Sequence, residues 1–343
     1  MGKLDILSMT YQEVENEIVN MGEPKFRAKQ IYGWIIKGAW GSEMKNVPAT
    51  LLKKLDDVFE FRLPSVKLKL VSSIDGTVKY LFELVDGECI ESVFMKYEHG
   101  NTLCISSQVG CRMGCKFCAS TLNGRVRNLE SSEMLGQIIA AQKDTGERIS
   151  NVVMMGIGEP LDNFDNTVKF LRLVSADYNL NIGLRHISLS TCGLVDKINA
   201  LSELELPITL SISLHAYDNE VRSAIMPINN KHSVEQLLIA CNSYFEKTGR
   251  RISFEYTLIA GKNDTAEGAR SLARLLKKYI KGPCHVNLIP LNEVKETGLA
   301  TSKNANIFKN KLLSLGINAT VRRKLGSDIN ASCGQLRHQE KQK

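Results

Sequence analysis

Residues 102–118 read TLCISSQVGCRMGCKFC, a short apolar run followed by three closely spaced cysteines, Cys111, Cys115 and Cys118. A structural zinc site uses four protein ligands and a disulfide uses two thiols. Three thiols therefore predict a site that the protein leaves incomplete. We expect a group other than protein to fill its last position.

Short apolar strands alternate with helix-like segments from about residue 100 to the C-terminus. The expected strands cover residues 102–107, 151–156, 186–191, 208–214, 252–259, 285–290 and 318–323. The expected helices include residues 131–146, 163–177, 233–248, 265–280 and 303–315. This alternation predicts parallel βαβ units, but too few of them for a closed eightfold barrel. We therefore expect an α/β fold built as a partial, open βα-barrel.

The first hundred residues follow a different pattern. Helical periodicity covers residues 11–21, 24–38 and 50–59, and alternating β-branched runs cover residues 66–73, 77–84 and 89–97. Asp-Gly pairs separate the runs, as they do in β-hairpins. We expect an accessory region over 1–98, with a helical module (1–60) and a β-hairpin adaptor (61–98), followed by the barrel domain over 99–343.

Composition places the chain among folded proteins with reduced thiols. Its 343 residues include 44 Lys and Arg against 37 Asp and Glu, and this net charge of +7 suits RNA or another polyanion without identifying it. Nine cysteines, an odd number in a chain of this length, do not resemble the disulfide framework of a secreted domain. The N-terminus shows no signal peptide or myristoylation pattern, and no apolar run is long enough to span a bilayer. The sequence predicts a cytoplasmic protein.

Basic residues gather in three places along the chain. They are Lys25, Arg27 and Lys29; Arg125 and Arg127; and Arg322, Arg323 and Lys324. Each group is compatible with a solvated surface or with contacts to phosphates, and the sequence alone does not decide between the two.

In a βα-barrel the reactive residues lie in loops at the carboxyl ends of the strands. The candidates there are GIGEP (156–160), Ser190, Ser213, Leu214, His215 and Asn292. GIGEP is not a dinucleotide fingerprint, because Leu161 stands at the third glycine position and Pro160 interrupts the helix start. A histidine such as His215 is in general more often a satisfied core residue than a ligand, but its place at a strand end favours a function.

Three thiolates can hold three irons of a four-iron cluster and leave the fourth iron open. The spacing C-x3-C-x2-C, with Phe117 before the last cysteine, resembles the radical S-adenosylmethionine (SAM) superfamily. The resemblance implies that the cysteines of residues 111–118 ligate a 4Fe–4S cluster, whose open iron binds SAM and cleaves it to a 5′-deoxyadenosyl radical. It also implies that Glu159 meets the amino group of SAM, although a structural role for this carboxylate in a buried loop stays open.

Further motifs extend the resemblance over nearly the whole chain. They are CIES (89–92), CISSQVGC (104–111), MMGIGEPLDN (154–163), SISLHA (211–216), NLIPLN (287–292) and GSDINASCGQL (326–336). Together they resemble the RlmN/Cfr family of RNA methyltransferases, in which the N-terminal helical module binds RNA. By this resemblance the SAM contacts are Gly158, Glu159, Ser190, Ser213, Leu214, His215 and Asn292. The catalytic residues are Glu91, Cys104 and Cys333.

The family's chemistry explains two cysteines that are not cluster ligands. Carbon 2 of adenine is electron-poor and does not attack the methyl group of SAM. In the family, one SAM methylates the cysteine that matches Cys333, and a second SAM supplies the radical that removes a hydrogen from this methyl group. The carbon radical adds to adenine, Glu91 takes the ring proton, and Cys104 attacks Cys333 to form a disulfide and release the product.

The two branches of the family differ in the carbon that they methylate. RlmN-type enzymes modify C2 of adenosine 2503 in 23S rRNA and C2 of adenosine 37 in some tRNAs. Cfr-type enzymes modify C8 of the same rRNA adenosine and give antibiotic resistance. Pro160 and the IPLN stretch favour the RlmN branch. Cys192 departs from the family pattern, since relatives often carry serine there, and it adds a thiol near the expected SAM site.

The resemblance also implies a reductive electron donor such as flavodoxin or ferredoxin, and we expect a monomer. Two readings outside this family stay open at the level of sequence. One is a non-enzymatic zinc-binding protein that binds RNA. The other is a radical SAM enzyme that acts on proteins or small molecules, which would need neither Cys104 nor Cys333.

Overall fold

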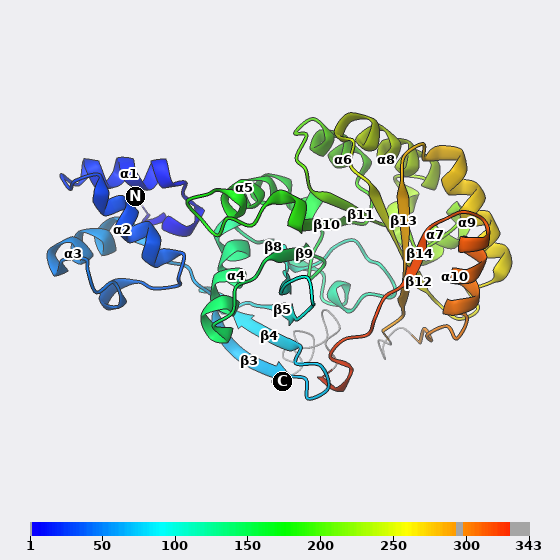
Figure 1. Ribbon diagram of the computed structural model, residues 1–343, viewed down its shortest axis with the longest axis horizontal. Coiled ribbons are helices and arrows are strands. Elements are labelled where there is room, and N and C mark those ends of the chain that lie inside the picture. The colour runs from blue at the N-terminus through cyan, green and yellow to red at the C-terminus, as the bar shows by residue number, and fades with distance from the viewer. Residues whose placement is uncertain (1, 293–297, 330–343) are drawn as a thin grey trace.

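A ten-stranded sheet with helices along one side forms the centre of the molecule (Figure 1). The structure, a computed structural model, describes residues 2–292 and 298–329. The strand order is β14-β13-β12-β11-β10-β9-β6-β5-β4-β3. These strands are β3 (Ser65–Val71), β4 (Val78–Glu83), β5 (Cys89–Met95), β6 (Thr102–Cys104), β9 (Asn151–Met154), β10 (Ile187–Thr191), β11 (Thr209–Ser213), β12 (Ile252–Leu258), β13 (Cys284–Pro290) and β14 (Ala319–Val321).

The seven strands β6 and β9 to β14 are parallel to their neighbours, as the strand–helix alternation predicts. β14 and β3 stand at opposite ends of the order, so the sheet does not close on itself within the described residues. The predicted α/β fold with an open barrel is confirmed. Because all seven strands run in one direction, their carboxyl ends lie at one edge of the sheet.

Helices follow most of the parallel strands. They are α4 (Ser131–Thr145), α5 (Phe164–Ser175), α6 (Val195–Ser202), α7 (Asn219–Ile225), α8 (Val234–Thr248), α9 (Ala266–Tyr279) and α10 (Ala305–Ser314). The sequence pattern does not predict α6 and α7, because eight and seven residues are too few to show helical periodicity. None of the described helices is long and apolar enough to cross a membrane.

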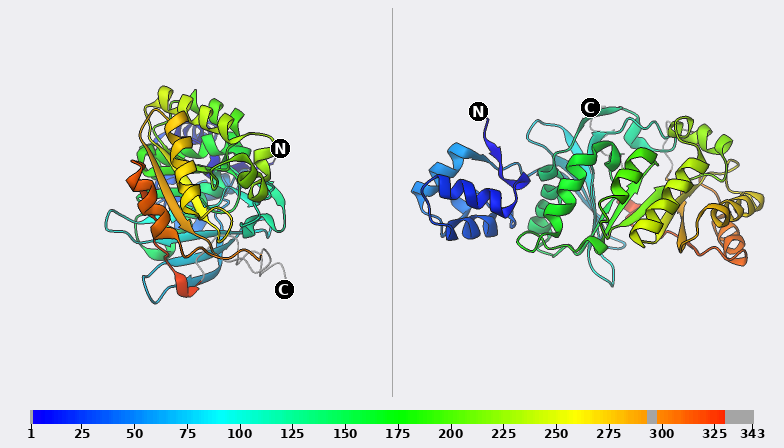
Figure 2. Two further views of the ribbon diagram at one scale, coloured as in Figure 1. Left: turned by 90° about the vertical axis from the view of Figure 1, so that its right-hand side faces the viewer. Right: turned by 90° about the horizontal axis from the view of Figure 1, so that it is seen from above.

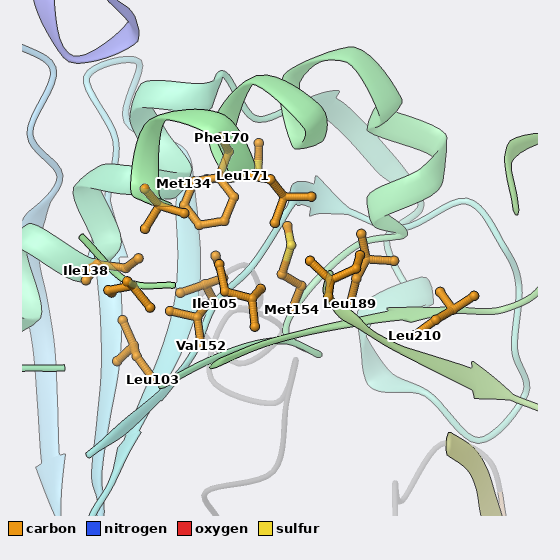
Figure 3. Packing of buried hydrophobic residues seen from close by; sticks show 14 of the residues in the cluster. Leu103, Ile105, Met134, Ile138, Val152, Met154, Phe170, Leu171, Leu189 and Leu210 are labelled. Atoms are coloured by element: carbon orange, nitrogen blue, oxygen red, sulfur yellow. The ribbon is translucent and has the colours of Figure 1, made fainter. Parts of the chain in front are cut away.

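The core between the parallel strands and helices α4 and α5 consists of buried apolar side chains. In Figure 3, Leu103, Ile105, Val152, Met154, Leu189 and Leu210 of the sheet layer meet Met134 and Ile138 of α4 and Phe170 and Leu171 of α5. All of these side chains are fully buried or nearly so. Met134 and Ile138 stand four residues apart, so they share one face of the helix. This packing fixes the ends of β6, β9 and β10, where the candidate site lies.

The N-terminal helices form a module that projects at one end of the molecule (Figure 2). Its elements are β1 (Leu4–Asp5), α1 (Tyr11–Asn20), α2 (Phe26–Ile35), α3 (Ala49–Val58) and β2 (Phe59–Glu60). The module meets the region around α5 through aromatic and polar contacts. The rings of Tyr32 and Tyr178 meet edge to face at 5.4 Å, and the amide of Asn179 donates to the Tyr32 hydroxyl over 3.0 Å. The division at residue 60 stays a prediction about folding units.

The strands expected as a hairpin adaptor extend the main sheet. β3, β4 and β5 are antiparallel, and β5 pairs with β6 so that Val93 lies opposite Cys104. The region 61–98 is therefore continuous with the barrel by hydrogen bonding. This pairing carries Glu91 of β5 to the side of the sheet where Cys104 lies.

Candidate functional site

The three cysteines lie in a loop that a two-stranded ribbon holds closed. The ribbon consists of β7 (Gln108–Gly110) and β8 (Arg125–Asn128). Gly110 has a φ of 76°, and a Cβ at this position would lie 1.9 Å from the carbonyl oxygen of Gly124. Only glycine fits such an approach. The amide of Cys111 then donates to the same carbonyl over 3.0 Å, which places the first cysteine at the base of the loop.

The carboxylate of Asp162 anchors the loop from the opposite side. It accepts hydrogen bonds from Gln108 (2.9 Å) and from the guanidinium groups of Arg112 (3.1 Å) and Arg125 (2.9 Å). These charged hydrogen bonds hold the pKa of Asp162 below its usual range, despite the opposing effect of burial. The loop is thus rigidly positioned against the residues that follow GIGEP.

The cysteine thiols are close enough to influence one another. Burial raises the pKa of Cys111 to about 12 and raises that of Cys115 further, and the neighbouring Cys118 adds to both shifts. Cys115 packs with Met113, Phe117 and other apolar side chains, so water has little access. Such thiols keep their protons until a metal replaces them.

The donor set fits an iron–sulfur cluster better than a single ion. Within the described residues, no group of three or more His, Cys, Asp or Glu side chains converges closely enough to hold one metal ion. Three soft sulfur donors in one short loop, set beside apolar side chains, suit a larger group such as a four-iron cluster. The residues present therefore fit the cofactor that the spacing predicts.

Glu159 ties together the ends of two strands. Its carboxylate accepts hydrogen bonds from the amides of Leu161 (3.0 Å) and Cys192 (2.7 Å), which link the loops after β9 and β10. Burial raises the pKa of Glu159, and the two backbone hydrogen bonds oppose that rise. The structural role left open by the sequence is therefore present. The side chains of Thr191 and Cys192 also interact with this carboxylate.

His215 follows β11 in a left-handed conformation with a φ of 55°. Its Nδ1 accepts from the amide of Thr257 over 2.9 Å, so the neutral ring carries its proton on Nε2. Burial lowers the pKa of His215 to about 3, so the ring stays neutral. Its edge meets the ring of Phe117 at 4.8 Å between centroids. Phe117 thereby joins the cysteine loop to the end of β11.

The other predicted SAM contacts lie at the same edge. Ser190 belongs to β10 and Ser213 to the neighbouring β11, while Leu214 is fully buried after β11 and Asn292 follows β13. Their place at the carboxyl ends of parallel strands agrees with the sequence analysis. Their role as SAM contacts stays a prediction.

A cavity of about 490 Å³ opens beside these strand ends and contains two of the three predicted catalytic residues. Its lining includes Glu91, Cys104, Gly156, Leu291, Asn292 and the basic residues Arg322, Arg323 and Lys324. Leu291 also packs in the apolar cluster around Cys115, so the cavity borders the cysteine loop. Cys333 lies outside the described residues.

Glu91 and Cys104 on the wall of the cavity are both buried. Glu91 is 2% exposed and pairs with the ammonium group of Lys79, which is fully buried, at 3.1 Å. Burial raises the pKa of Cys104 to about 11, and the positive charge of Arg322 opposes this rise. The cavity therefore holds a carboxylate that is paired and a thiol that is protonated in the resting protein.

Sequence reasoning missed several residues at the site. Lys79 occupies an inward position in an apolar strand, and a lysine there is the signal that could have found it. Arg222 of α7 is fully buried among the strand-end loops, and nothing in its local sequence indicates this. Cys192 lies next to Cys115 in the same apolar cluster, so the thiol expected near the site is there.

The three groups of basic residues named in the sequence analysis make different contacts in the structure. Arg125 pairs with Asp162, and Arg127 pairs with Glu133 and Asp86, so the second group is structural. The exposed Lys25 of the first group pairs with the half-buried Glu15 of α1, and the third group lines the cavity. The second group therefore stabilises the fold through ion pairs, whereas the third group lines a cavity where it can meet a ligand.

The comparisons with known proteins agree with this geometry. Residues 105–276 match the radical SAM superfamily, so the chain is a radical SAM enzyme. Residues 4–61 match the N-terminal domain of ribosomal RNA large subunit methyltransferases. The chain belongs to the RlmN family of radical SAM RNA methyltransferases. Membership implies a 4Fe–4S cluster, SAM and an RNA substrate.

Individual relatives cover almost the whole chain. A protein of Clostridium perfringens named "Probable dual-specificity RNA methyltransferase RlmN" is 56% identical over 97% of this chain and 96% of its own length. A protein of Alkaliphilus oremlandii with the same name is 52% identical over the full length of both. The crystal structure of a radical SAM methyltransferase from Sphaerobacter thermophilus superposes with a TM-score of 0.91, at 38% identity over 97% of this chain and 98% of that one. The predicted family, fold and enzyme class are confirmed, and the zinc-protein alternative is wrong.

Proposed function

We propose that this protein methylates C2 of adenosine 2503 in 23S rRNA and C2 of adenosine 37 in tRNAs, with Cys333 as the methyl carrier. One observation supports this most strongly: a single cavity beside the cysteine loop contains both Glu91 and Cys104. A radical SAM enzyme without a protein-bound intermediate has no need of a second thiol there. The relatives named as dual-specificity RNA methyltransferases support the pair of RNA substrates.

The edge of the sheet supplies the cofactor side of the reaction. Cys111, Cys115 and Cys118 would ligate the cluster, which when bound supplies the electron that cleaves SAM. The strand ends would hold SAM through Gly158, Glu159, Ser190, Ser213, Leu214, His215 and Asn292, with two SAM molecules used per turnover. Glu159 offers a carboxylate to an amino group, and the Nε2–H of His215 offers a neutral donor.

Glu91 would accept the proton that leaves C2 once the ring carries the new carbon. Its carboxylate is kept from water on the cavity wall, and Lys79 holds it in place at 3.1 Å. A carboxylate on the wall of this cavity would be a suitable base if the cavity admits the adenine.

Cys104 would then release the product. Its sulfur forms a bond to the sulfur of Cys333, and the bond between Cys333 and the methylated product breaks. The electron pair of that bond goes to the product carbon, which takes a proton, and the single electron left over from radical addition would return to the bound cluster. Because burial raises the pKa of Cys104 to about 11, its proton must be removed during this step. The positive charge of Arg322 on the same cavity wall favours that removal.

The remaining parts of the proposal concern partners. The N-terminal module would bind the RNA, and a flavodoxin or ferredoxin would deliver the electron to a monomeric enzyme. An rRNA and tRNA substrate would place the enzyme in the cytoplasm.

Mass spectrometry of nucleosides after anaerobic reaction with rRNA and tRNA tests the proposal. Chromatography separates 2-methyladenosine from 8-methyladenosine, so the same run decides between C2 and the C8 chemistry of the Cfr branch. We expect 2-methyladenosine from both RNAs. A product methylated at C8, or no methylated adenosine with a fully loaded enzyme, would contradict the proposal.

A further inference from the structure

Arg222 is a buried cation at the centre of the strand-end loops. Its side chain is fully buried, and it is the largest such side chain in the described residues. The guanidinium donates to the carbonyls of Cys192 (2.7 Å), Ser213 (3.1 Å) and Leu214 (3.1 Å), and to the side-chain oxygen of Asn229 (3.3 Å). It therefore straps the loop after β10 to the loop after β11.

The loop around Arg222 is shaped to admit the guanidinium. Gly193 has a φ of 104°, and a Cβ there would lie 2.9 Å from Leu237 and 3.4 Å from Nη2 of Arg222. Asn229 is itself held by the hydroxyl of Ser223 at 2.8 Å. The position of the cation is thus fixed by its neighbours.

Each guanidinium nitrogen of Arg222 donates a hydrogen bond, but none of the acceptors carries a negative charge that would balance the cation. All four acceptors are neutral, and no carboxylate of the described residues forms a salt bridge with it. Glu159 stands on the other side of the Cys192 peptide, where it accepts from the amide of Cys192 while Arg222 binds the carbonyl. A buried charge without a counter-ion is unfavourable, so such a group implies an anion that joins the site.

The titratable groups near Arg222 are three thiols and the imidazoles of His215 and His232, and the charge of Arg222 helps to lower the pKa of both imidazoles. Burial lowers the pKa of Arg222, and Cys192, Cys115 and Cys241 oppose this shift. Cys192 belongs to the loop after β10 and Cys241 to α8, whereas Cys115 belongs to the cysteine loop. Of these three thiols, only Cys115 is a predicted metal ligand and becomes a thiolate when a cluster binds.

We propose that Arg222 is the buried counter-charge of the cysteine-bound cluster. Three thiolates bring negative charge into an apolar pocket, and each electron that the bound cluster accepts adds more. A fixed cation nearby stabilises the bound cluster and favours its reduced state, because net charge is one of the factors that set cluster potentials. The hydrogen bonds of Arg222 go to the backbone of the strand-end loops and to Asn229, so the role proposed here is an electrostatic effect on the bound cluster and not a catalytic one. The inference rests on the cluster-binding part of the proposed function and not on the RNA product.

Two substitutions separate the charge of Arg222 from its hydrogen bonds. Arg222→Lys keeps the charge but loses the planar fork, and Arg222→Gln loses both. The matched control is Arg250→Gln, because Arg250 also donates to a carbonyl, that of Ile208 at 3.3 Å, but at the opposite end of β11. Each variant is reconstituted anaerobically, and its iron content and reduction midpoint are measured by a spectroscopic redox titration.

We expect Arg222→Gln to lose cluster or to hold one with a more negative midpoint, while Arg222→Lys and Arg250→Gln stay close to the unchanged protein. Equal midpoints and iron content in all four proteins would overturn the proposal. Equal impairment of Arg222→Lys and Arg222→Gln would also overturn it, because the hydrogen bonds would then be what matters.

Urea unfolding of the cluster-free proteins covers the case in which a variant folds poorly. Both Arg222 variants lose the strap between Ser213 and Cys192, so the proposal predicts similar losses of stability in the absence of the cluster. An Arg222→Gln protein that is unfolded without cluster, beside a folded Arg222→Lys protein, would contradict it, since the charge would then be needed by the fold alone. RNA methylation is not a readout in any of these experiments, so failure here and failure of the proposed function remain distinguishable.

Discussion

The two sides of the site are built in opposite ways. On the cysteine side, at the ends of β9, β10 and β11, the polar side chains of Glu159, His215 and Arg222 are occupied by hydrogen bonds to the backbone or to fixed neighbours. On the cavity side, Arg323 and Lys324 are exposed, and within residues 2–292 and 298–329 no carboxylate forms a salt bridge with them.

This difference matches the different ligands that we expect on the two sides, a cofactor on the cysteine side and RNA on the cavity side. A cofactor that cleaves SAM needs a dry and rigid pocket, and the backbone hydrogen bonds provide it before any ligand binds. A large polyanion needs a surface whose charges are still available, and the cavity side offers one. Glu91 is the exception on the cavity side, because it is buried and paired like a residue of the cysteine side.

The largest expected effect is loss of the cofactor from the cysteine side. Cys115→Ala should abolish the broad visible absorption of the cluster and all cleavage of SAM, because two remaining thiolates do not anchor a four-iron cluster. Cys284→Ala is the control, since this half-buried thiol of β13 lies outside the loop. A brown, active Cys115→Ala protein would refute the ligand assignment.

Breaking the exceptional ion pair should have the next largest effect. Glu91→Gln leaves Lys79 buried without its carboxylate, so we expect a loss of about 3–5 kcal/mol in the free energy of unfolding, together with loss of RNA methylation. The double variant Glu91→Gln with Lys79→Met should recover stability in urea unfolding but not activity. Equal stability of Glu91→Gln and the unchanged protein would show that the pair is not a buried one.

The rigid histidine of the cysteine side predicts a pH dependence. Since burial lowers the pKa of His215 to about 3, the unfolded chain binds a proton that the folded chain refuses between about pH 6.5 and 3. The contribution of His215 to the free energy of unfolding is therefore fully present above pH 6.5. It falls with decreasing pH, by up to about 1.4 kcal/mol per pH unit. Denaturation of the cluster-free protein should show a shallower loss in His215→Asn, while the exposed His186→Asn control should follow the unchanged protein. The same slope in both variants would mean that His215 is not held neutral.

The smallest expected effect concerns charges of the N-terminal module. Replacing Lys25, Arg27 and Lys29 with Gln should weaken RNA binding and flatten its dependence on salt, by about 0.7–0.9 in the log–log slope for each phosphate that the module no longer neutralises. Iron content should not change, because the module lies away from the cysteine loop (Figure 1). RNA affinity that is unaltered at every salt concentration would assign RNA binding elsewhere.

The fold was largely readable from the sequence because its signals are periodic. Apolar strands such as 151–156 alternate with helices such as 163–177, and the structure has β9 and α5 at these places. The pattern missed α6 and α7, which are too short to repeat, whereas in the region 61–98 it predicted the three strands β3, β4 and β5. Hairpin signals predict that these strands pair with each other, but they do not show that β5 also pairs with β6 and so joins the hairpins to the parallel sheet.

The site was readable where chemistry demands a residue type at a fixed spacing. Three cysteines within residues 111–118 indicate a metal site. Arg222 was not readable, because its importance lies in its burial and in the lack of a carboxylate partner, and for Lys79 the sequence shows only a lysine in an apolar strand and not its ion pair. Those properties belong to the packed protein and leave no local pattern in a single sequence.

The central claim is that two thiols outside the cysteine loop carry and release the methyl group, and Cys104→Ala tests it most directly. This variant keeps the cluster ligands and Cys333, so it should methylate Cys333, cleave SAM and add the carbon to adenine, and then stall. The account predicts RNA bound covalently to protein through Cys333, seen as a slow band on a denaturing gel that nuclease reduces to protein bearing one nucleotide. A folded Cys104→Ala protein that turns over normally, or that cleaves SAM in the presence of RNA without ever trapping it, would contradict the account.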